Sequence, residues 1–262
     1  MNPPSASNGS VEVSIIPLPS VSRLRQAAAW AVHAYTALGM VAGFLALSST
    51  TAGQAQQAFF WMLVAGLIDA TDGTLARIVD VKKVLPWFDG AKLDDIIDYF
   101  TFVIVPVAFL YYFSLFPAAG TLIFVAMPLL ASAYGFCQAA AKTADFFFTG
   151  FPSYWNIIAF YLYAAQAPPW LTATVVCVLS ILVFVPIRYV YPTRTVPFRG
   201  LTNVLGGVWV VLLLLLLWQL PTPSQWLVIG SFYYPLYYTA LSLYLHVTQP
   251  TVSAKSTSVP PA

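Results

Sequence analysis

The chain has 262 residues, of which 60% are hydrophobic and 8% are charged, and its formal net charge is +2. Soluble domains carry roughly 25% charged residues, so this composition excludes an ordinary soluble domain. Four long intervals contain no charged residue, and they run from Arg25 to Asp69, Asp98 to Lys142, Asp145 to Arg188 and Arg199 to Lys255. Because about 20 apolar residues cross a bilayer as a helix, the sequence predicts an all-α, polytopic membrane helix bundle.

In chain order, residues 1–25 are rich in Ser, Pro and Asn and are expected to form a flexible cytoplasmic tail. The run from Gln26 to Leu47 is too long for a signal-peptide core and lacks a convincing cleavage site, so a retained helix is expected. Residues 26–249 form the predicted transmembrane domain, and residues 250–262 form a second tail. The eight predicted transmembrane helices are about 28–48, 56–79, 91–115, 118–141, 153–166, 170–190, 203–220 and 225–247.

Cations occur only in alternate connections of this arrangement. The cation-bearing segments are the two tails, the 80–90 loop, the 142–152 loop and the 189–202 loop. The connections near 49–55, 116–118, 166–170 and 220–225 carry no charge of either sign. Cytoplasmic loops are enriched in Lys and Arg, so both termini are expected on the cytoplasmic side.

Aspartates gather at the cytoplasmic ends of the second and third predicted helices. They follow the pattern Asp69-x2-Asp72-Gly73-x2-Ala76-Arg77, then twelve residues, then Gly90-x3-Asp94-Asp95-x2-Asp98. The first group has the i, i+3, i+4, i+7 spacing of one helical face. Asp94 and Asp98 are one turn apart on the next, antiparallel helix, so two carboxylate pairs are expected to face each other.

Converging carboxylates near a membrane would repel one another unless a cation holds them. Oxygen ligands suit Mg²⁺ or Mn²⁺, and two facing pairs can hold two ions for an in-line phosphoryl displacement. One alternative is a structural polar network neutralised by Arg77 or Lys92, but two bases cannot balance this many acids. Another is a divalent-cation transporter, which would need polar groups in the outer halves of the helices, where the chain has no charge.

The aspartate pattern resembles the signature of the CDP-alcohol phosphotransferase family. These integral membrane enzymes move a phosphoalcohol or phosphatidyl group from a CDP donor to a second alcohol and release CMP. All eight signature residues are present, although the twelve-residue spacer is longer than usual for the family. That spacer and the eight predicted helices are similar to those of bacterial phosphatidylcholine synthases. The stretches 33–39 and 142–156 support the same resemblance.

The resemblance implies a role for each motif residue. Asp69, Asp72 and Asp94 would ligate the metals, and Asp98 would ligate one metal and act as general base. The cytidine diphosphate pocket would be lined by Gly73, Ala76, Arg77, Thr36 and His33. His33 stands where many members carry Asn. Lys142 is expected to be either a phosphate contact or an ordinary cytoplasmic cation.

Choline would be recognised through its quaternary ammonium group, which aromatic ring faces hold. The candidate aromatic residues near the cytoplasmic side are Tyr154, Trp155, Tyr99 and Trp87. Taken singly, each of them is better explained as a packing residue or as part of an interfacial aromatic belt. The sequence does not choose among the four.

The expected reaction is phosphatidyl transfer from CDP-diacylglycerol to choline, with Mn²⁺ or Mg²⁺, two ions in all. The resemblance further implies a bacterial inner membrane location among membrane lipids, a homodimer, and no nucleic-acid partner. A sibling enzyme using serine, glycerol phosphate or inositol phosphate is the alternative within the family. A phosphorylated acceptor would need a cationic pocket, which could be built from Lys142, Arg188, Arg194 and Arg199.

Overall fold

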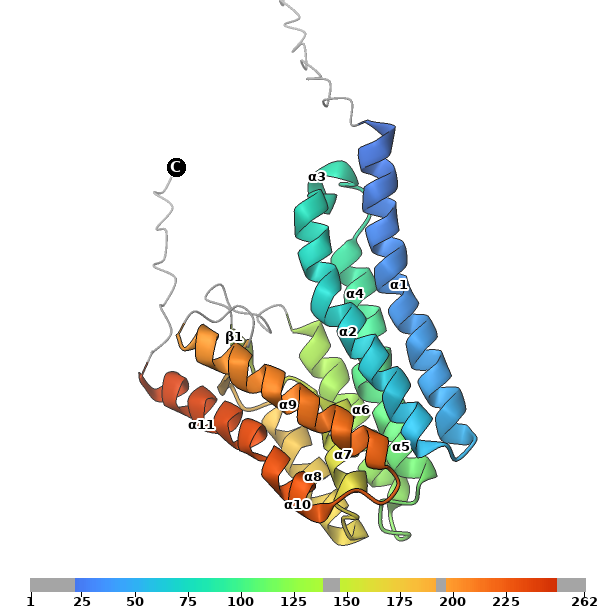
Figure 1. The fold of residues 1–262 in the computed structure, drawn as a ribbon, viewed down its shortest axis with the longest axis vertical. Helices are drawn as coiled ribbons and strands as arrows, with labels where there is room; N and C mark the ends of the chain where they lie inside the picture. Colours follow the sequence, from blue (N-terminus) through green and yellow to red (C-terminus); the bar gives the residue numbers. More distant parts are fainter. Residues whose placement is uncertain (1–21, 139–146, 192–196, 249–262) are drawn as a thin grey trace, which may run out of the picture.

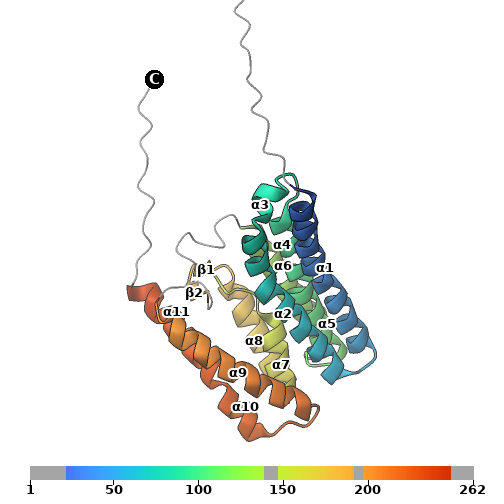
Figure 2. The same cartoon turned by 45° about the horizontal axis from the view of Figure 1, so that its top comes forward.

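The computed structural model describes residues 22–138, 147–191 and 197–248, and helices dominate it. The predicted helical fold is therefore confirmed, but the expectation of an all-α fold misses a short two-stranded ribbon. The first helices in chain order are α1 (Arg23–Thr51), α2 (Ala55–Val79), α3 (Val81–Val84), α4 (Gly90–Asp98), the π-helix η1 (Tyr99–Ile104), α5 (Val105–Tyr112) and α6 (Thr121–Cys137). The remaining helices are α7 (Trp155–Ala164), α8 (Pro169–Leu182), α9 (Arg199–Gln219), α10 (Gln225–Ser231) and α11 (Tyr233–Thr248). Figures 1 and 2 show α1 and α2 side by side at one edge of the bundle, with α9 and α11 at the other.

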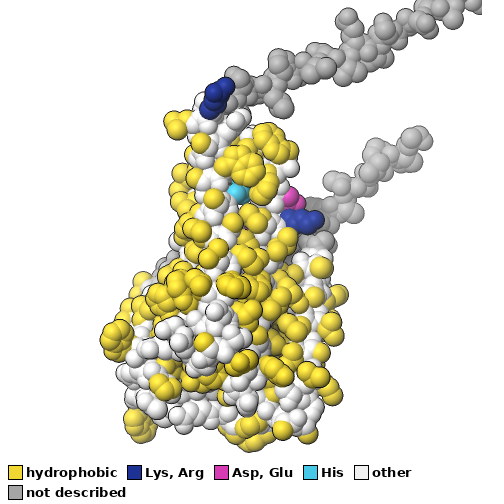
Figure 3. All heavy atoms as spheres, turned by 90° about the vertical axis from the view of Figure 1, so that its right-hand side faces the viewer, with side chains coloured by type: hydrophobic (Ala, Val, Ile, Leu, Met, Phe, Trp, Pro, Cys, Tyr) yellow, Lys and Arg dark blue, Asp and Glu magenta, His cyan; other side chains and the backbone are white. Residues whose placement is uncertain are grey.

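Each of the eight predicted segments contains a helix, but their lengths differ. Within the described ranges, three helices (α1, α2 and α9) are long and apolar enough to cross a membrane, while α6, α7 and α8 are apolar and shorter. Figure 3 shows a largely hydrophobic face on which charged side chains are confined to the upper part. Large apolar side chains are exposed along these helices, including Phe44 and Trp218. Such surfaces suit a lipid environment, and the number of crossings stays a prediction.

The prediction of the sixth helix, 170–190, is wrong at its C-terminal end. α8 ends at Leu182, and Arg188–Val190 instead form strand β2, which pairs antiparallel with β1 (Phe147–Thr149). Pro186 accounts for the stop, because proline lacks an N–H and disfavours helical geometry in the residue before it. The aromatic and β-branched residues that follow suit an extended strand.

Prolines also interrupt two other predicted helices. The eighth, 225–247, divides into α10 and α11, and Pro235 lacks the N–H that would have bonded to Ser231 at the end of α10. The third, 91–115, ends at Tyr112 and contains η1, where the N–H of Val105 bonds to the carbonyl of Phe100. Pro106 lies in the first turn of α5 and has no N–H to donate to the preceding turn, which suits the change from the wide turn to an α-helix.

The helix α1 approaches α4 and η1 closely through two glycines. A Cβ on Gly39 would lie 3.0 Å from Cγ2 of Ile97, and one on Gly43 would lie 2.8 Å from the side chains of Phe100 and Thr101. Small residues at such crossings allow helix backbones to come together. This contact fixes the position of the helix that carries Asp94 and Asp98.

We expect Gly43→Ala to destabilise the protein, because the new methyl group has to displace the Phe100 ring. Overpacking of this kind costs about 1–3 kcal/mol. Gly66→Ala is the matched control, since a Cβ there meets nothing within 4 Å. Thermal unfolding of the purified protein in detergent should show a lower midpoint for Gly43→Ala only. Equal midpoints would contradict the close packing of α1 on η1.

Candidate metal and substrate site

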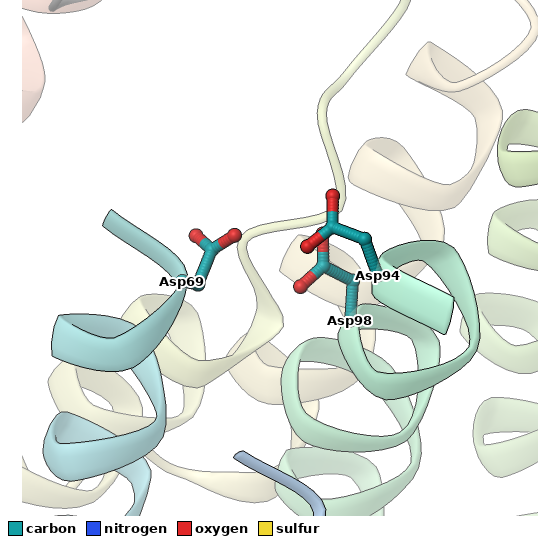
Figure 4. A group of neighbouring side chains, drawn as sticks. All are labelled: Asp69, Asp94 and Asp98. Atoms are coloured by element: carbon teal, nitrogen blue, oxygen red, sulfur yellow. The ribbon is translucent and has the colours of Figure 1, made fainter. Parts of the chain in front are cut away.

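The side-chain carboxylates of three aspartates from two helices converge, and we call this set of three the carboxylate group. Asp69 lies on α2, and Asp94 and Asp98 lie one turn apart on α4. Each offers one carboxylate oxygen, and these oxygens all lie within 4.8 Å of one another. Figure 4 shows the three side chains directed toward one another across the space between the two helices. The structure thus brings together three of the four predicted metal ligands.

Asp72, the fourth predicted ligand, lies just beyond this carboxylate group. It is buried, with 6% of its surface exposed. It lines a small cavity of about 10 Å³ together with the three converging aspartates and Thr36. Helical spacing explains this placement, because residues three apart on α2 share a face. All four carboxylates therefore border one small volume.

The start of α4 is fixed by two local interactions. The Asp89 carboxylate accepts a hydrogen bond from the backbone N–H of Lys92 at 3.0 Å and so caps the helix. His33 of α1 packs against Gly90, where a Cβ would lie 2.5 Å from its Cε1. The His33 ring also contacts Phe88, with 4.4 Å between centroids. Any side chain at Gly90 would displace His33, so the motif glycine is required here by packing.

Of the residues expected to bind the nucleotide, Thr36 borders the small cavity beside this group, and Arg77 lies about two turns beyond Asp69 on α2. Arg77 is exposed, and its Nη2 donates a hydrogen bond to Oγ1 of Thr74 at 2.7 Å. Its Nη1 would lie 3.4 Å from a Cβ on Gly73, so the guanidinium sits beside the glycine. Ala76 is half-buried against the small apolar cluster at Val81. Lys142, the predicted phosphate contact, lies outside the described residues.

A larger cavity of about 180 Å³ opens beside the carboxylate group. One side is acidic, formed by Asp69, Asp94, Asp95 and Asp98. The other side is apolar and aromatic and comes from the β1–β2 ribbon, the connection to α7, and parts of η1, α6 and α8. Its lining residues are Phe102, Gly135, Phe136, Phe148, Thr149, Gly150, Phe151, Pro152, Ser153, Tyr154, Val183 and Tyr191. The carboxylates therefore face a space that can admit a small molecule.

Of the four aromatic residues considered for choline, Tyr154 lines this cavity. Trp155 is fully buried and donates its indole N–H to Oγ of Ser132 at 2.8 Å. Tyr99 donates its hydroxyl to the Leu129 carbonyl at 2.8 Å. Trp87 is 69% exposed in the connection between α3 and α4.

Sequence reasoning missed the remaining aromatic lining of the cavity. Phe148 comes from β1, and Tyr191 directly follows β2. Phe148 lies in the Phe-Phe-Phe-Thr-Gly-Phe-Pro stretch, which contributed to the family resemblance but carried no assigned role. Nothing in the sequence near Tyr191 indicates that it meets Phe148. Their contact depends on strand pairing across a separation of about forty residues.

Comparison with known proteins gives a consistent result, although no family model matches the chain. It is 37% identical over 202 residues to phosphatidylcholine synthase of Pseudomonas aeruginosa, an alignment that covers 77% of this chain and 85% of that protein. It is 36% identical over 221 residues to phosphatidylcholine synthase of Rhizobium meliloti, covering 84% and 88%. The chain belongs to the phosphatidylcholine synthase family.

A third relative, phosphatidylcholine synthase of Bradyrhizobium diazoefficiens, is 40% identical over 188 residues, covering 71% of this chain and 70% of that protein. These alignments extend far beyond the residues 69–98 that contain the aspartate motif. Membership of the phosphatidylcholine synthase family therefore rests on most of the chain.

The carboxylate group predicts divalent-metal binding that can be measured without turnover. Asp69→Asn and Asp94→Asn each remove one charged ligand and should weaken Mn²⁺ binding at least about tenfold. Asp80→Asn is the matched control, because Asp80 pairs with exposed Lys83 and asparagine tolerates its left-handed backbone conformation. Electron paramagnetic resonance of free Mn²⁺ titrated with purified protein gives the affinities. Unchanged binding in both site variants would refute the metal site.

Proposed function

We propose that this chain transfers the phosphatidyl group of CDP-diacylglycerol to choline, giving phosphatidylcholine and CMP. The relatives named phosphatidylcholine synthase support the overall reaction. The observation that carries the proposal is the convergence of Asp69, Asp94 and Asp98 within 4.8 Å at the wall of a cavity. This arrangement suits chemistry on a pyrophosphate, whose negative charge must be neutralised before a nucleophile approaches.

The carboxylate group fits a divalent ion, with Mg²⁺ or Mn²⁺ as the expected cofactor. Oxygen ligands lie about 2.0–2.1 Å from Mg²⁺, so opposite ligands are about 4.2 Å apart. The present spread of up to 4.8 Å needs only small side-chain movements to reach that geometry. Two bound ions, the second involving Asp72, would neutralise the pyrophosphate and polarise the phosphoryl group.

Asp98 is proposed as the general base. The choline hydroxyl is a poor nucleophile near neutral pH, so its proton must leave as its oxygen bonds to phosphorus. Asp98 takes that proton, and the bond between the diacylglycerol-linked phosphorus and the bridging oxygen breaks. CMP leaves with the electron pair of that bond. Asp98 lies one turn beyond Asp94 and borders the cavity from which an acceptor can approach.

The nucleotide is proposed to lie along α1 and α2, held by Gly73, Ala76, Arg77, Thr36 and His33. The Arg77 guanidinium is a planar, permanently charged fork that suits phosphate oxygens. His33 is buried, and its Nε2 has no hydrogen-bond partner among the described residues. Buried polar groups normally have partners, so a bound nucleotide is a natural candidate. Lys142 is proposed as a further phosphate contact.

The proposed site faces the cytoplasm of a bacterial inner membrane, with eight crossings, both tails inside and one membrane domain at residues 26–249. In Figures 1 and 2 the start of α1 and the helix α3 lie at one end of the bundle, and α11 runs from the opposite end toward that side, which supports this topology. The uncharged connections after α1, α7 and α9 lie at the opposite end.

Impermeant thiol labelling of a Lys82→Cys variant from outside should fail.

The alternative functions are not favoured. The relatives at 35–46% identity are all named phosphatidylcholine synthase, rather than enzymes for serine, glycerol phosphate or inositol phosphate, or transporters. The homodimer implied by the family resemblance stays a prediction.

The proposed function predicts which acceptor alcohols support CMP release. Purified protein given CDP-diacylglycerol and Mn²⁺ should release CMP with choline, and much less with serine, glycerol phosphate or inositol phosphate. Excess chelator should abolish CMP release, and added Mn²⁺ or Mg²⁺ should restore it. Rapid release with a phosphorylated acceptor and none with choline would reassign the enzyme, and full activity in chelator would exclude the metal.

The role of Asp98 can be separated from that of Asp94. Loss of a general base costs about 10²–10⁴-fold in rate. Asp98→Asn should therefore lose CMP release by that factor while keeping more Mn²⁺ affinity than Asp94→Asn. CMP release and Mn²⁺ titration on the same preparations provide the comparison. An equal loss of metal binding in the two variants would make Asp98 a ligand only.

A further inference from the structure

The cavity beside the carboxylate group has an aromatic wall that the catalytic proposal does not use. Three of its rings, Phe148, Tyr154 and Tyr191, come from the β1–β2 ribbon and the connection to α7. Phe148 and Tyr191 have ring centroids 4.8 Å apart with planes inclined by 39°. Phe148 and Tyr154 are 6.5 Å apart and nearly perpendicular, at 86°. We call these three residues the aromatic cage.

Strand pairing places Phe148 and Tyr191 on one face of the ribbon and Arg188 on the other. Cα partners in an antiparallel pair share a face, and successive residues alternate between faces. Phe148 pairs with Tyr189, so Tyr191 follows on the same face as Phe148. Arg188 projects to the other face, where its guanidinium lies 4.0 Å from the Phe147 ring centroid. The ribbon thus presents aromatic rings to the cavity and directs its cation away from it.

The cage is held in place by its surroundings. The N–H groups of Gly150 and Phe151 donate to the carbonyls of Ile187 and Leu182 at 2.9 and 3.0 Å. Gly150 has φ of +81°, and a Cβ there would lie 2.2 Å from the Val183 carbonyl oxygen. The loop can therefore approach α8 this closely only with glycine at this position.

Tyr154 is fixed by the residues on either side of it. Ser153 donates its hydroxyl to Ser132 at 2.9 Å, and the indole N–H of Trp155 donates to the same hydroxyl at 2.8 Å. Behind the cage, Tyr238 lies 6.4 Å from Tyr154 between ring centroids. Trp155 accordingly acts as a positioning residue, and Tyr154 is the ring that borders the cavity.

The cavity combines ring faces with carboxylates, and this combination selects for a particular ligand. A quaternary ammonium group cannot donate hydrogen bonds and is held by the negative faces of aromatic rings. A carboxylate or phosphate would instead meet ring faces and nearby aspartates. The described lining residues include no Lys or Arg. Asp69 and Tyr154 line the same cavity, so the cage lies beside the carboxylate group.

Resting on the proposed function, we propose that Phe148, Tyr154 and Tyr191 hold the trimethylammonium group of the acceptor. The hydroxyl end of the acceptor then points toward Asp94 and Asp98 on the opposite wall. The cage contacts the methyl groups on nitrogen and so distinguishes acceptors by how many they carry. The carboxylates on the opposite wall lie beside the reacting oxygen. Choline should accordingly be preferred over N,N-dimethylethanolamine, and dimethylethanolamine over ethanolamine.

The kinetic test uses Phe148→Leu and Tyr191→Leu, which remove a ring face and keep an apolar side chain. Each should raise the choline KM about tenfold, leave the CDP-diacylglycerol KM unchanged and flatten the preference among the three amino alcohols. Tyr191→Phe keeps the ring face and should restore the choline KM. Tyr112→Leu is the matched control, because Tyr112 is 51% exposed at the end of α5, outside the site.

A binding measurement separates the cage from the catalytic proposal. Saturation-transfer nuclear magnetic resonance with tetramethylammonium should detect binding to the full-length protein and its loss in Tyr191→Leu. If wild-type protein binds tetramethylammonium in this way but releases no CMP with choline, the proposed function fails and the cage stands. No tetramethylammonium binding, or a choline KM unchanged in both leucine variants, overturns the cage.

Discussion

The mutual repulsion of three carboxylates within 4.8 Å is the constraint on which the rest of this site depends. Like charges so close together favour separation, so the packing of α2 and α4 has to hold these side chains near one another. The close approach of α1 to α4 and η1 at Gly39 and Gly43 provides that rigidity. The converging aspartates are thus positioned by a helix that contributes none of the three carboxylates.

The same packing links the conformation of η1 to the site. The wide turn begins immediately after Asp98, at Tyr99, and Pro106 follows it. The side chains of Phe100 and Thr101 within this turn meet Gly43 of α1. A π-helical turn rotates the residues that follow relative to those before it, and such turns are frequent at functional sites. Here the turn lets Asp98 face α2 while Phe100 packs against α1.

Much of this could be predicted from the sequence, because helical spacing is a local property. The spacing of Asp69, Asp94 and Asp98 predicted facing carboxylates, and the structure shows them converging. The ribbon could not be predicted in this way, since its pairing joins residues about forty positions apart. Apolar periodicity also extended the sixth helix past Pro186, whose effect on the backbone outweighed the continuing hydrophobicity. The aromatic wall was missed because it depends on that same long-range pairing.

The register of the ribbon determines which of its side chains border the cavity. Phe148 pairs with Tyr189, while Arg188 lies on the opposite face against Phe147. A slip of one residue in a β-pair transfers every side chain to the other face. A single insertion or deletion beside β2 would therefore turn a guanidinium toward the cavity and withdraw Tyr191 from it. In this fold, strand register as well as residue identity determines which side chains face the cavity.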